Sequence, residues 1–147
     1  MTARNDIRLA VQNNFLAFTG GHFTYTSVNV KDYDIAGLTS TSFPVINIIL
    51  LDEENNFQDN IGKLDIDMKM MIEGIPYADE ITAQEEIDKV LEDIKTVILS
   101  DPQLGQSALD SVYIKSNVFA LGTDLPALTT RVEFTVSYRE TRPLCNQ

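Results

Sequence analysis

The side chains that could perform catalysis are few and stand apart in this sequence. His22 is the only histidine; it follows Gly20 and Gly21, and no serine or cysteine lies beside it in a nucleophile motif. A general base needs such a partner, so we interpret His22 as a structural or surface residue. Cys145 is the only cysteine, which excludes an intrachain disulfide and favours a reducing compartment. We therefore predict no catalytic residues and no enzymatic activity.

Oxygen ligands for a hard cation occur in two places, and neither forms a complete site. Three residues match the first, third and fifth positions of a calcium-binding loop: Asp52, Glu54 and Asn56. The sixth position is Phe57 where glycine is required, and the twelfth is Lys63 where a bidentate glutamate is required. Asp65 and Asp67 point the same way from one expected strand but lack a third ligand. We predict neither a metal ion nor a cofactor.

The acidic residues are concentrated in one part of the chain. The formal net charge is −11, and the span from Asp52 to Asp93 accounts for all of it, with fourteen acidic residues against three lysines. Such a segment argues against nucleic-acid binding, which requires Lys and Arg to displace counterions from phosphates. It favours a surface that repels DNA or that meets a basic protein. The alternative is that these acids only solvate a sheet and a helix.

The size and composition indicate one domain over residues 1–147, with residues 141–147 as an extended tail. With 147 residues and 44% hydrophobic residues, the chain can bury a core without disulfides or metal. The N-terminus has no apolar stretch of signal-peptide length, and no 18 apolar residues run together. We expect neither signal-directed secretion nor a membrane span.

Two helices are predicted from apolar residues at helical spacing. The clearer one runs from Thr82 to Ser100, with Thr82 and Glu85 spaced as a capping box and Asp101-Pro102 as its end. The other spans about Asn5 to Thr19.

Five strands are predicted from alternating or continuous apolar residues: 23–30 with a kink, 43–51, 64–73, 111–119 and 128–138. Polar loops are expected at 32–42, 52–62 and 120–127. The order α-β-β-β-α-β-β predicts an α+β domain, in which two helices pack on one face of a mainly antiparallel sheet of about five strands.

The segment from Thr82 to Arg139 resembles the tail terminator, or tail completion, proteins of long-tailed bacteriophages. The resemblance lies in an acidic amphipathic helix, EEIDKVLEDIKTVILS, that runs into Asp101-Pro102-Gln103-Leu104-Gly105. A strand from Val112 to Ile114 and a last alternating strand ending in Tyr138-Arg139 follow. Family members commonly have a second small residue after the Leu-Gly, where this chain has Gln106. The first half of the chain is compatible in the order of its elements.

The resemblance implies a structural virion protein. Copies of the chain would form a hexameric ring on the head-proximal end of the tail tube, stop its growth and join it to the head connector. The implied partners are other copies, the tube protein, the head-tail connector and, in contractile tails, the sheath. DNA would pass through the ring without specific binding. The protein would be located in the neck of the virion after assembly in the host cytoplasm.

The resemblance also implies roles for named residues. The candidate lumen-facing acids are Asp52, Glu53, Glu54 and Asp59. The candidate inter-subunit anchors are Phe57 and Phe119, and the candidate structural turn consists of Asp101, Pro102, Leu104 and Gly105. Three alternatives stay open: another phage neck, connector or tube subunit; an acidic monomer that mimics DNA and binds a basic protein; and a small-ligand or enzymatic domain.

Overall fold

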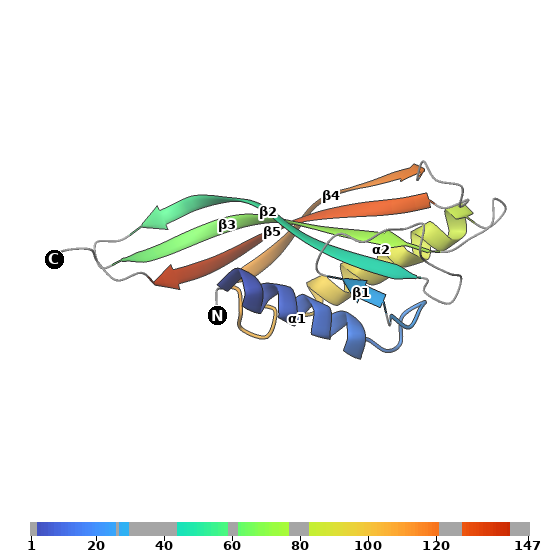
Figure 1. Ribbon diagram of the computed structural model, residues 1–147, viewed down its shortest axis with the longest axis horizontal. Helices are drawn as coiled ribbons and strands as arrows, with labels where there is room; N and C mark the ends of the chain where they lie inside the picture. Colours follow the sequence, from blue (N-terminus) through green and yellow to red (C-terminus); the bar gives the residue numbers. More distant parts are fainter. Residues whose placement is uncertain are drawn as a thin grey trace.

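The computed structural model describes residues 3–25, 27–29, 44–58, 62–76, 83–120 and 128–141. The elements in order are α1 (Ala3–Ala17), β1 (Ser27–Asn29), β2 (Val45–Gln58), β3 (Lys63–Ile75), α2 (Ala83–Leu99), β4 (Asp110–Ala120) and β5 (Leu128–Thr141). The strands form one sheet in the order β1-β2-β3-β5-β4 (Figure 1). Strands β2, β3, β5 and β4 pair antiparallel, and the short β1 adds a parallel strand beside the start of β2. The predicted α+β class and element order are confirmed.

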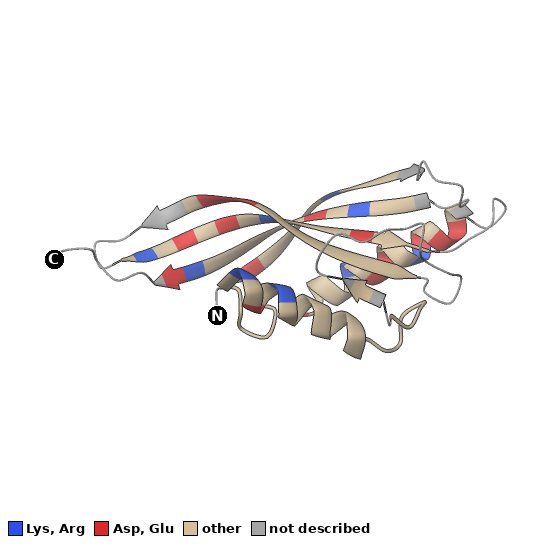
Figure 2. Ribbon diagram, viewed as in Figure 1, with Lys and Arg blue, Asp and Glu red and all other residues tan. Residues whose placement is uncertain are grey.

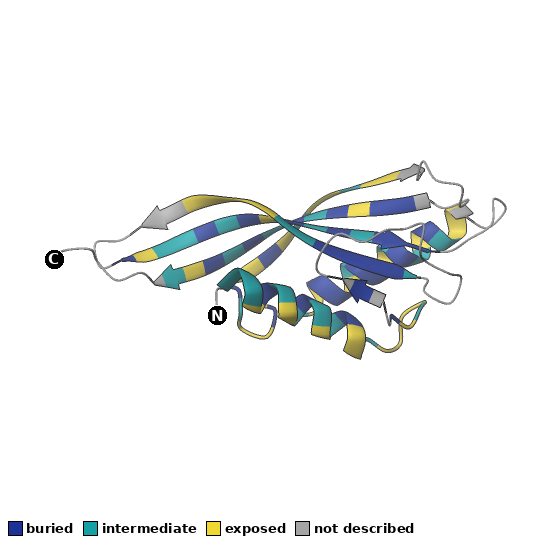
Figure 3. Cartoon of the chain, viewed as in Figure 1, coloured by how far each residue is buried: buried dark blue, intermediate teal, exposed yellow. Residues whose placement is uncertain are grey.

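Alternation along the strands separates a helix-covered face from an open face. In β3, Met68, Met70 and Ile72 are fully buried, while the alternate residues Lys69 and Glu73 point the other way. The antiparallel register continues this pattern into β5, because Met70 lies opposite the buried Phe134. Each side chain buried this way stabilises the fold by about 1.5–3 kcal/mol. The core therefore lies between the sheet and the two helices (Figure 3).

Both helices bury the apolar stripes that their spacing predicts. In α1 the buried residues are Ile7, Val11 and Phe15. In α2 they include Ile87, Val90, Ile94, Val97 and Ile98. Thr82, the expected cap of α2, lies outside the described residues, so the capping box of Thr82 and Glu85 stays a prediction.

Gly74 sets how closely α2 approaches the sheet. A Cβ atom at this position would lie 2.3 Å from Val90 Cγ1 and 2.9 Å from Ile94 Cδ1. Contacts this short do not occur between real carbon atoms, so a larger residue would push α2 away from β3. The absence of a side chain at Gly74 lets the helix lie directly on the strand.

Three strands extend past the helices as a twisted arm, which we define as residues 52–58 of β2, 63–68 of β3 and 136–141 of β5 (Figure 1). The prediction of a loop from Asp52 was wrong, because β2 continues to Gln58 and pairs there with Leu64. A bulge between Leu50 and Glu53 breaks the alternation. The described side chains of β2 from Asp52 to Asn55 are exposed, and the strand is held there by its backbone ladder, so apolar residues are not needed and the sequence pattern resembles that of a loop.

The first predicted strand is also shorter than expected. Only Ser27–Asn29 pairs with β2, whereas Phe23 and Tyr25 precede the strand. Their aromatic rings pack together in an edge-to-face contact with centroids 6.3 Å apart, which explains an aromatic segment that does not form a ladder. The predicted loop at 32–42 lies outside the described residues, and so does the predicted loop at 120–127 except for Ala120, which is the last residue of β4.

The connection from α2 to β4 contains three consecutive residues with positive φ: Leu104 (47°), Gly105 (64°) and Gln106 (74°). Leu104 is fully buried, and burial offsets the cost of this conformation for a branched residue. The Asp101 carboxylate accepts hydrogen bonds from the Gly105 N–H and the Asn14 amide, both at 3.0 Å. Asp101, Pro102, Leu104 and Gly105 thus lie together in this turn, and Ser111 Oγ donates to the Pro102 carbonyl at 2.7 Å.

We predict that Gly74→Ala lowers the free energy of unfolding by about 1–3 kcal/mol, because the added methyl group overlaps Val90. The measurement is urea denaturation followed by circular dichroism. Adding Val90→Ala removes the clashing atom, so the double variant should lose less than the sum of the two single variants. Strictly additive losses would contradict the assigned contact.

Candidate functional site

The open face of the sheet carries paired charges in rows across β3 and β5 (Figure 2). The contacts are Arg131 Nε–Glu73 Oε2 at 2.8 Å, Lys69 Nζ–Glu133 Oε1 at 3.8 Å, Arg139 Nε–Asp65 Oδ1 at 2.7 Å and Ser137 Oγ–Asp67 Oδ1 at 2.6 Å. The hydrogen bond from Arg139 lowers the pKa of the Asp65 carboxyl below its usual range. Most charges at the centre of this face are therefore compensated within the chain.

Charges without an ion pair lie toward the two edges of this face. Asp52 and Glu54 on β2 form no ion pair with a described residue, and neither does Lys115 on β4. Asp52 and Glu54 line a hollow of about 290 Å³ together with Asp67 and Lys69. The hollow is only partly enclosed, which suits contact with another molecule's surface rather than enclosure of a small ligand.

Glu53 points to the helix-covered side and takes part in a contact that fixes the base of the arm. Its Oε2 accepts a hydrogen bond from the Tyr138 hydroxyl at 2.5 Å and an ion pair from Arg4 Nη1 at 3.2 Å. The Arg4 guanidinium also donates to the carbonyls of Leu50 and Leu51, both at 3.1 Å, at the β2 bulge. Burial and the Glu53 contact raise the pKa of Tyr138. Of the four predicted lumen-facing acids, the structure thus brings together Asp52 and Glu54, separates Glu53, and does not describe Asp59.

The two predicted aromatic anchors both lie in strands. Phe57 is in the arm part of β2 and is paired with Asp65, and Phe119 is near the end of β4 and is paired with Thr129. Phe57 was interpreted as an isolated aromatic in a loop, which is wrong for its backbone. The side chains of both residues lie outside the described part of the structure.

The acids of the span from Asp52 to Asp93 that the structure describes do not form one surface. Asp52, Glu54 and Asp67 lie on the open face of the sheet. The acids of α2 lie on the helix layer, on the other side of the molecule (Figure 2). The field expected from the sequence is therefore divided between two opposite sides by the fold.

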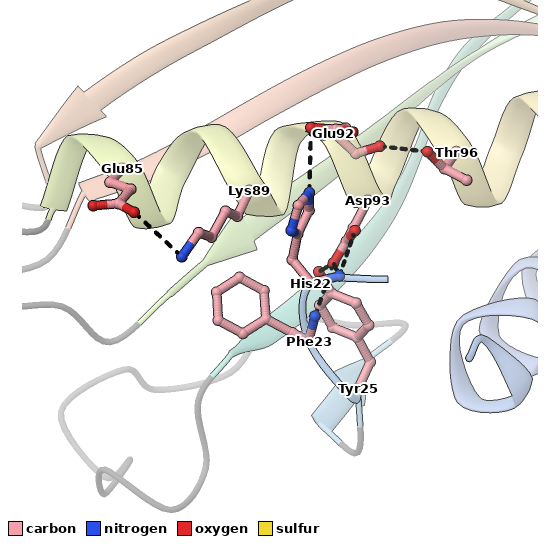
Figure 4. A network of polar contacts seen from close by, with 8 residues as sticks. All are labelled: His22, Phe23, Tyr25, Glu85, Lys89, Glu92, Asp93 and Thr96. Atoms are coloured by element: carbon pink, nitrogen blue, oxygen red, sulfur yellow. Dashed lines mark hydrogen bonds and ion pairs between the residues drawn. The ribbon is translucent and has the colours of Figure 1, made fainter. Parts of the chain in front are cut away.

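Asp93 is a buried carboxylate that links α2 to the segment after α1 (Figure 4). Its Oδ2 accepts hydrogen bonds from the Tyr25 hydroxyl at 2.7 Å and from the Phe23 N–H at 3.1 Å, and its Oδ1 accepts from the His22 N–H at 3.0 Å. The His22 ring lies outside this cluster, with Nε2 3.2 Å from Glu92 Oε2. The Asp93 contacts are structural, and the His22 side chain is exposed, which agrees with its interpretation as a structural or surface residue.

Sequence reasoning missed the roles of Asp93 and Arg4. Asp93 follows Val90 by three residues and precedes Val97 by four, which places it on the buried stripe of α2. An acidic residue on the buried face of a helix indicates a buried hydrogen-bonded contact, so the sequence did contain a signal for Asp93. Arg4 gave no comparable signal, because the bulge that it contacts cannot be located from the sequence.

Within the described ranges, no group of three or more His, Cys, Asp or Glu side chains is arranged to hold a metal ion. Among the helices that the structure describes, none is both long and apolar enough to cross a membrane. No protein-family model and no curated protein matches this chain. A function must therefore be argued from the surface and the edges of the sheet.

We predict that Asp93→Ala lowers the free energy of unfolding by at least about 3 kcal/mol, because three donors lose their acceptor in a buried environment. Glu92→Ala is the matched control on the neighbouring residue, whose exposed side chain pairs with the His22 ring, and should change stability by less than about 0.5 kcal/mol. Urea denaturation measures both variants. Equal losses would show that the Asp93 contacts contribute nothing specific.

The buried hydroxyl of Tyr25 predicts a loss of stability at alkaline pH. Burial and the hydrogen bond to Asp93 raise the pKa of Tyr25 above its usual value of 10.0. The folded chain then keeps a proton that the unfolded chain releases, so this contribution is complete below pH 10.0 and declines above it. The expected slope from this group is about 1.4 kcal/mol per pH unit. Tyr25→Phe should remove that part of the slope in urea unfolding; an unchanged slope would contradict the assignment.

Proposed function

We propose that this protein is a structural subunit of a phage tail, which forms a ring at the head-proximal end of the tail tube and ends its growth. The observation that carries the proposal is the one-sided cover of the sheet. Helices pack on one face, and the other face is broad, polar and charged. A channel wall needs such a face, with its core on the far side.

The charges of the open face support passage of DNA without binding. Salt bridges compensate the arginines and lysine at its centre, so they are not available to phosphates. Asp52 and Glu54 add negative charge without an ion pair in the described chain. In a ring with this face inward, DNA would be repelled from the wall.

The same distribution disfavours a DNA mimic. Such a mimic needs a continuous acidic surface, and here the acids are divided between the open face and the outer side of α2. A small-ligand site is also disfavoured, because the hollow on the open face is only partly enclosed.

The test is growth of tail tubes from the tube protein of the same genome, imaged by electron microscopy with and without this protein. We expect shorter tubes, each with an extra ring of density at one end. Tubes of unchanged length with bare ends would overturn the proposal.

A charge control separates capping from a general effect of acidic protein. Glu85→Lys with Asp88→Lys reverses two charges on the outer side of α2 and changes the net charge from −11 to −7, since each reversal adds two. This variant leaves the open face intact and should cap tubes as the unmodified protein does. Loss of capping in this variant would show that bulk charge causes the effect.

A further inference from the structure

We propose that the sheet continues from one copy of the chain to the next, with β4 of one copy pairing antiparallel with the arm part of β2 in its neighbour. This inference rests on the proposed ring and specifies how its subunits join. Its basis is the pair of unprotected edges and the charges beside them.

β4 is an edge strand suited to pairing with a strand of another chain. β4 is the last strand of the sheet and pairs only with β5 in the described chain. Exposed large apolar side chains gather on it and just before it, with exposed fractions of 47% for Val112, 47% for Ile114, 45% for Val118 and 45% for Leu109. An edge of this length with apolar side chains favours addition of another strand.

The opposite edge is protected in its first half and open in its second. β1 covers residues 45–47 of β2. Arg4 then occupies the carbonyls of Leu50 and Leu51. Beyond the bulge, residues 53–58 of β2 have no strand on their outer side in the described chain. This stretch is the part of the edge that can receive a strand.

The directions of the strands are compatible with this joint. In the order β2-β3-β5-β4 every neighbouring pair is antiparallel, so β4 and β2 run in opposite directions. A second copy placed beside the first in the same orientation therefore meets β4 with an antiparallel β2. This contact is heterologous and can repeat, which is what a ring requires.

The charges at the two edges favour one pairing register between β4 and β2, and they favour a second copy of the chain as the partner. Lys115 lies opposite Glu133 on the open face, and Asp52 and Glu54 lie on the same face at the other edge. Within the described chain none of Lys115, Asp52 and Glu54 forms an ion pair. Joining the edges with the open faces continuous brings the lysine of one copy beside the acids of the next.

The register implies a stagger between copies. Across one sheet Lys115 is level with Ile49, through Glu133 and Met71. Bringing Lys115 level with Glu54 shifts the neighbour by about five residues along the strands, and a closed sheet requires such a shear. The shift moves β4 past residues 45–47 of β2, which β1 covers, and sets residues 111–116 of β4 opposite the open stretch at 53–58. It also sets Val112 level with the strand position of Phe57.

Charge reversal with rescue tests the joint in the full chain. Lys115→Glu and Glu54→Lys should each raise the concentration needed for assembly by about tenfold or more, because like charges then meet at every joint. The double variant restores opposite charges and should assemble like the unmodified protein. Sedimentation over a concentration series measures the mass of the assemblies.

Lys89→Glu is the matched control for the rescue, because it makes the same charge change on α2, away from both edges. It should not rescue Glu54→Lys. Rescue by Lys89→Glu, or no rescue by Lys115→Glu, would overturn the proposed joint.

Cysteine cross-linking separates this joint from a symmetric dimer. In a Cys145→Ser background, Ile114→Cys on β4 and Asn55→Cys on β2 are made as separate chains. A short bis-maleimide should link the two chains when they are mixed and should link neither variant to itself. Self-linking of Ile114→Cys would indicate a symmetric β4–β4 contact and overturn the proposal, as would no linking in the mixture.

The outcome is independent of tube capping. Capping without the mixed cross-link overturns the joint and leaves the proposed function standing. The mixed cross-link without capping supports the joint and counts against the proposed function.

Discussion

The buried Asp93 carboxylate determines how the two helices share one face of the sheet. A charged group in this position is tolerated only when hydrogen-bond donors replace water. The backbone N–H groups of His22 and Phe23 and the Tyr25 hydroxyl supply them, and all three come from the segment between α1 and β1. The contact therefore fixes where α1 ends and where β1 begins relative to α2. Gly74 fixes the other distance, between α2 and β3.

Because both helices lie on one side, the second face of the sheet has a different chemistry. Its central charges are compensated across neighbouring strands, as in Glu73–Arg131 and Asp65–Arg139. Such exposed pairs add little stability. They do, however, pair the arginines and the lysine at the centre of the face with acids of neighbouring strands, and this pairing supports our proposal of a channel wall.

The two edges of the sheet differ in how far they are covered. Arg4 closes the bulge of β2, and β1 covers the start of the same strand. β4 has no such protection in the described chain and exposes Val112, Ile114 and Val118. Natural sheets usually guard an edge of this length. An unguarded edge opposite an acidic arm is consistent with a chain that associates with its own copies.

The sequence by itself determined the helices, most strands and the fold class, because apolar spacing reports which side of each element is buried. It could not determine the arm, because residues 52–58 pair through their backbone and need no apolar side chains. It also could not separate Glu53 from Asp52 and Glu54, because the bulge that turns Glu53 toward Tyr138 is a feature of strand pairing. The concentration of acids was visible in the sequence. Only the tertiary structure divided them between two sides of the molecule and left Lys115, Asp52 and Glu54 at opposite edges of one face.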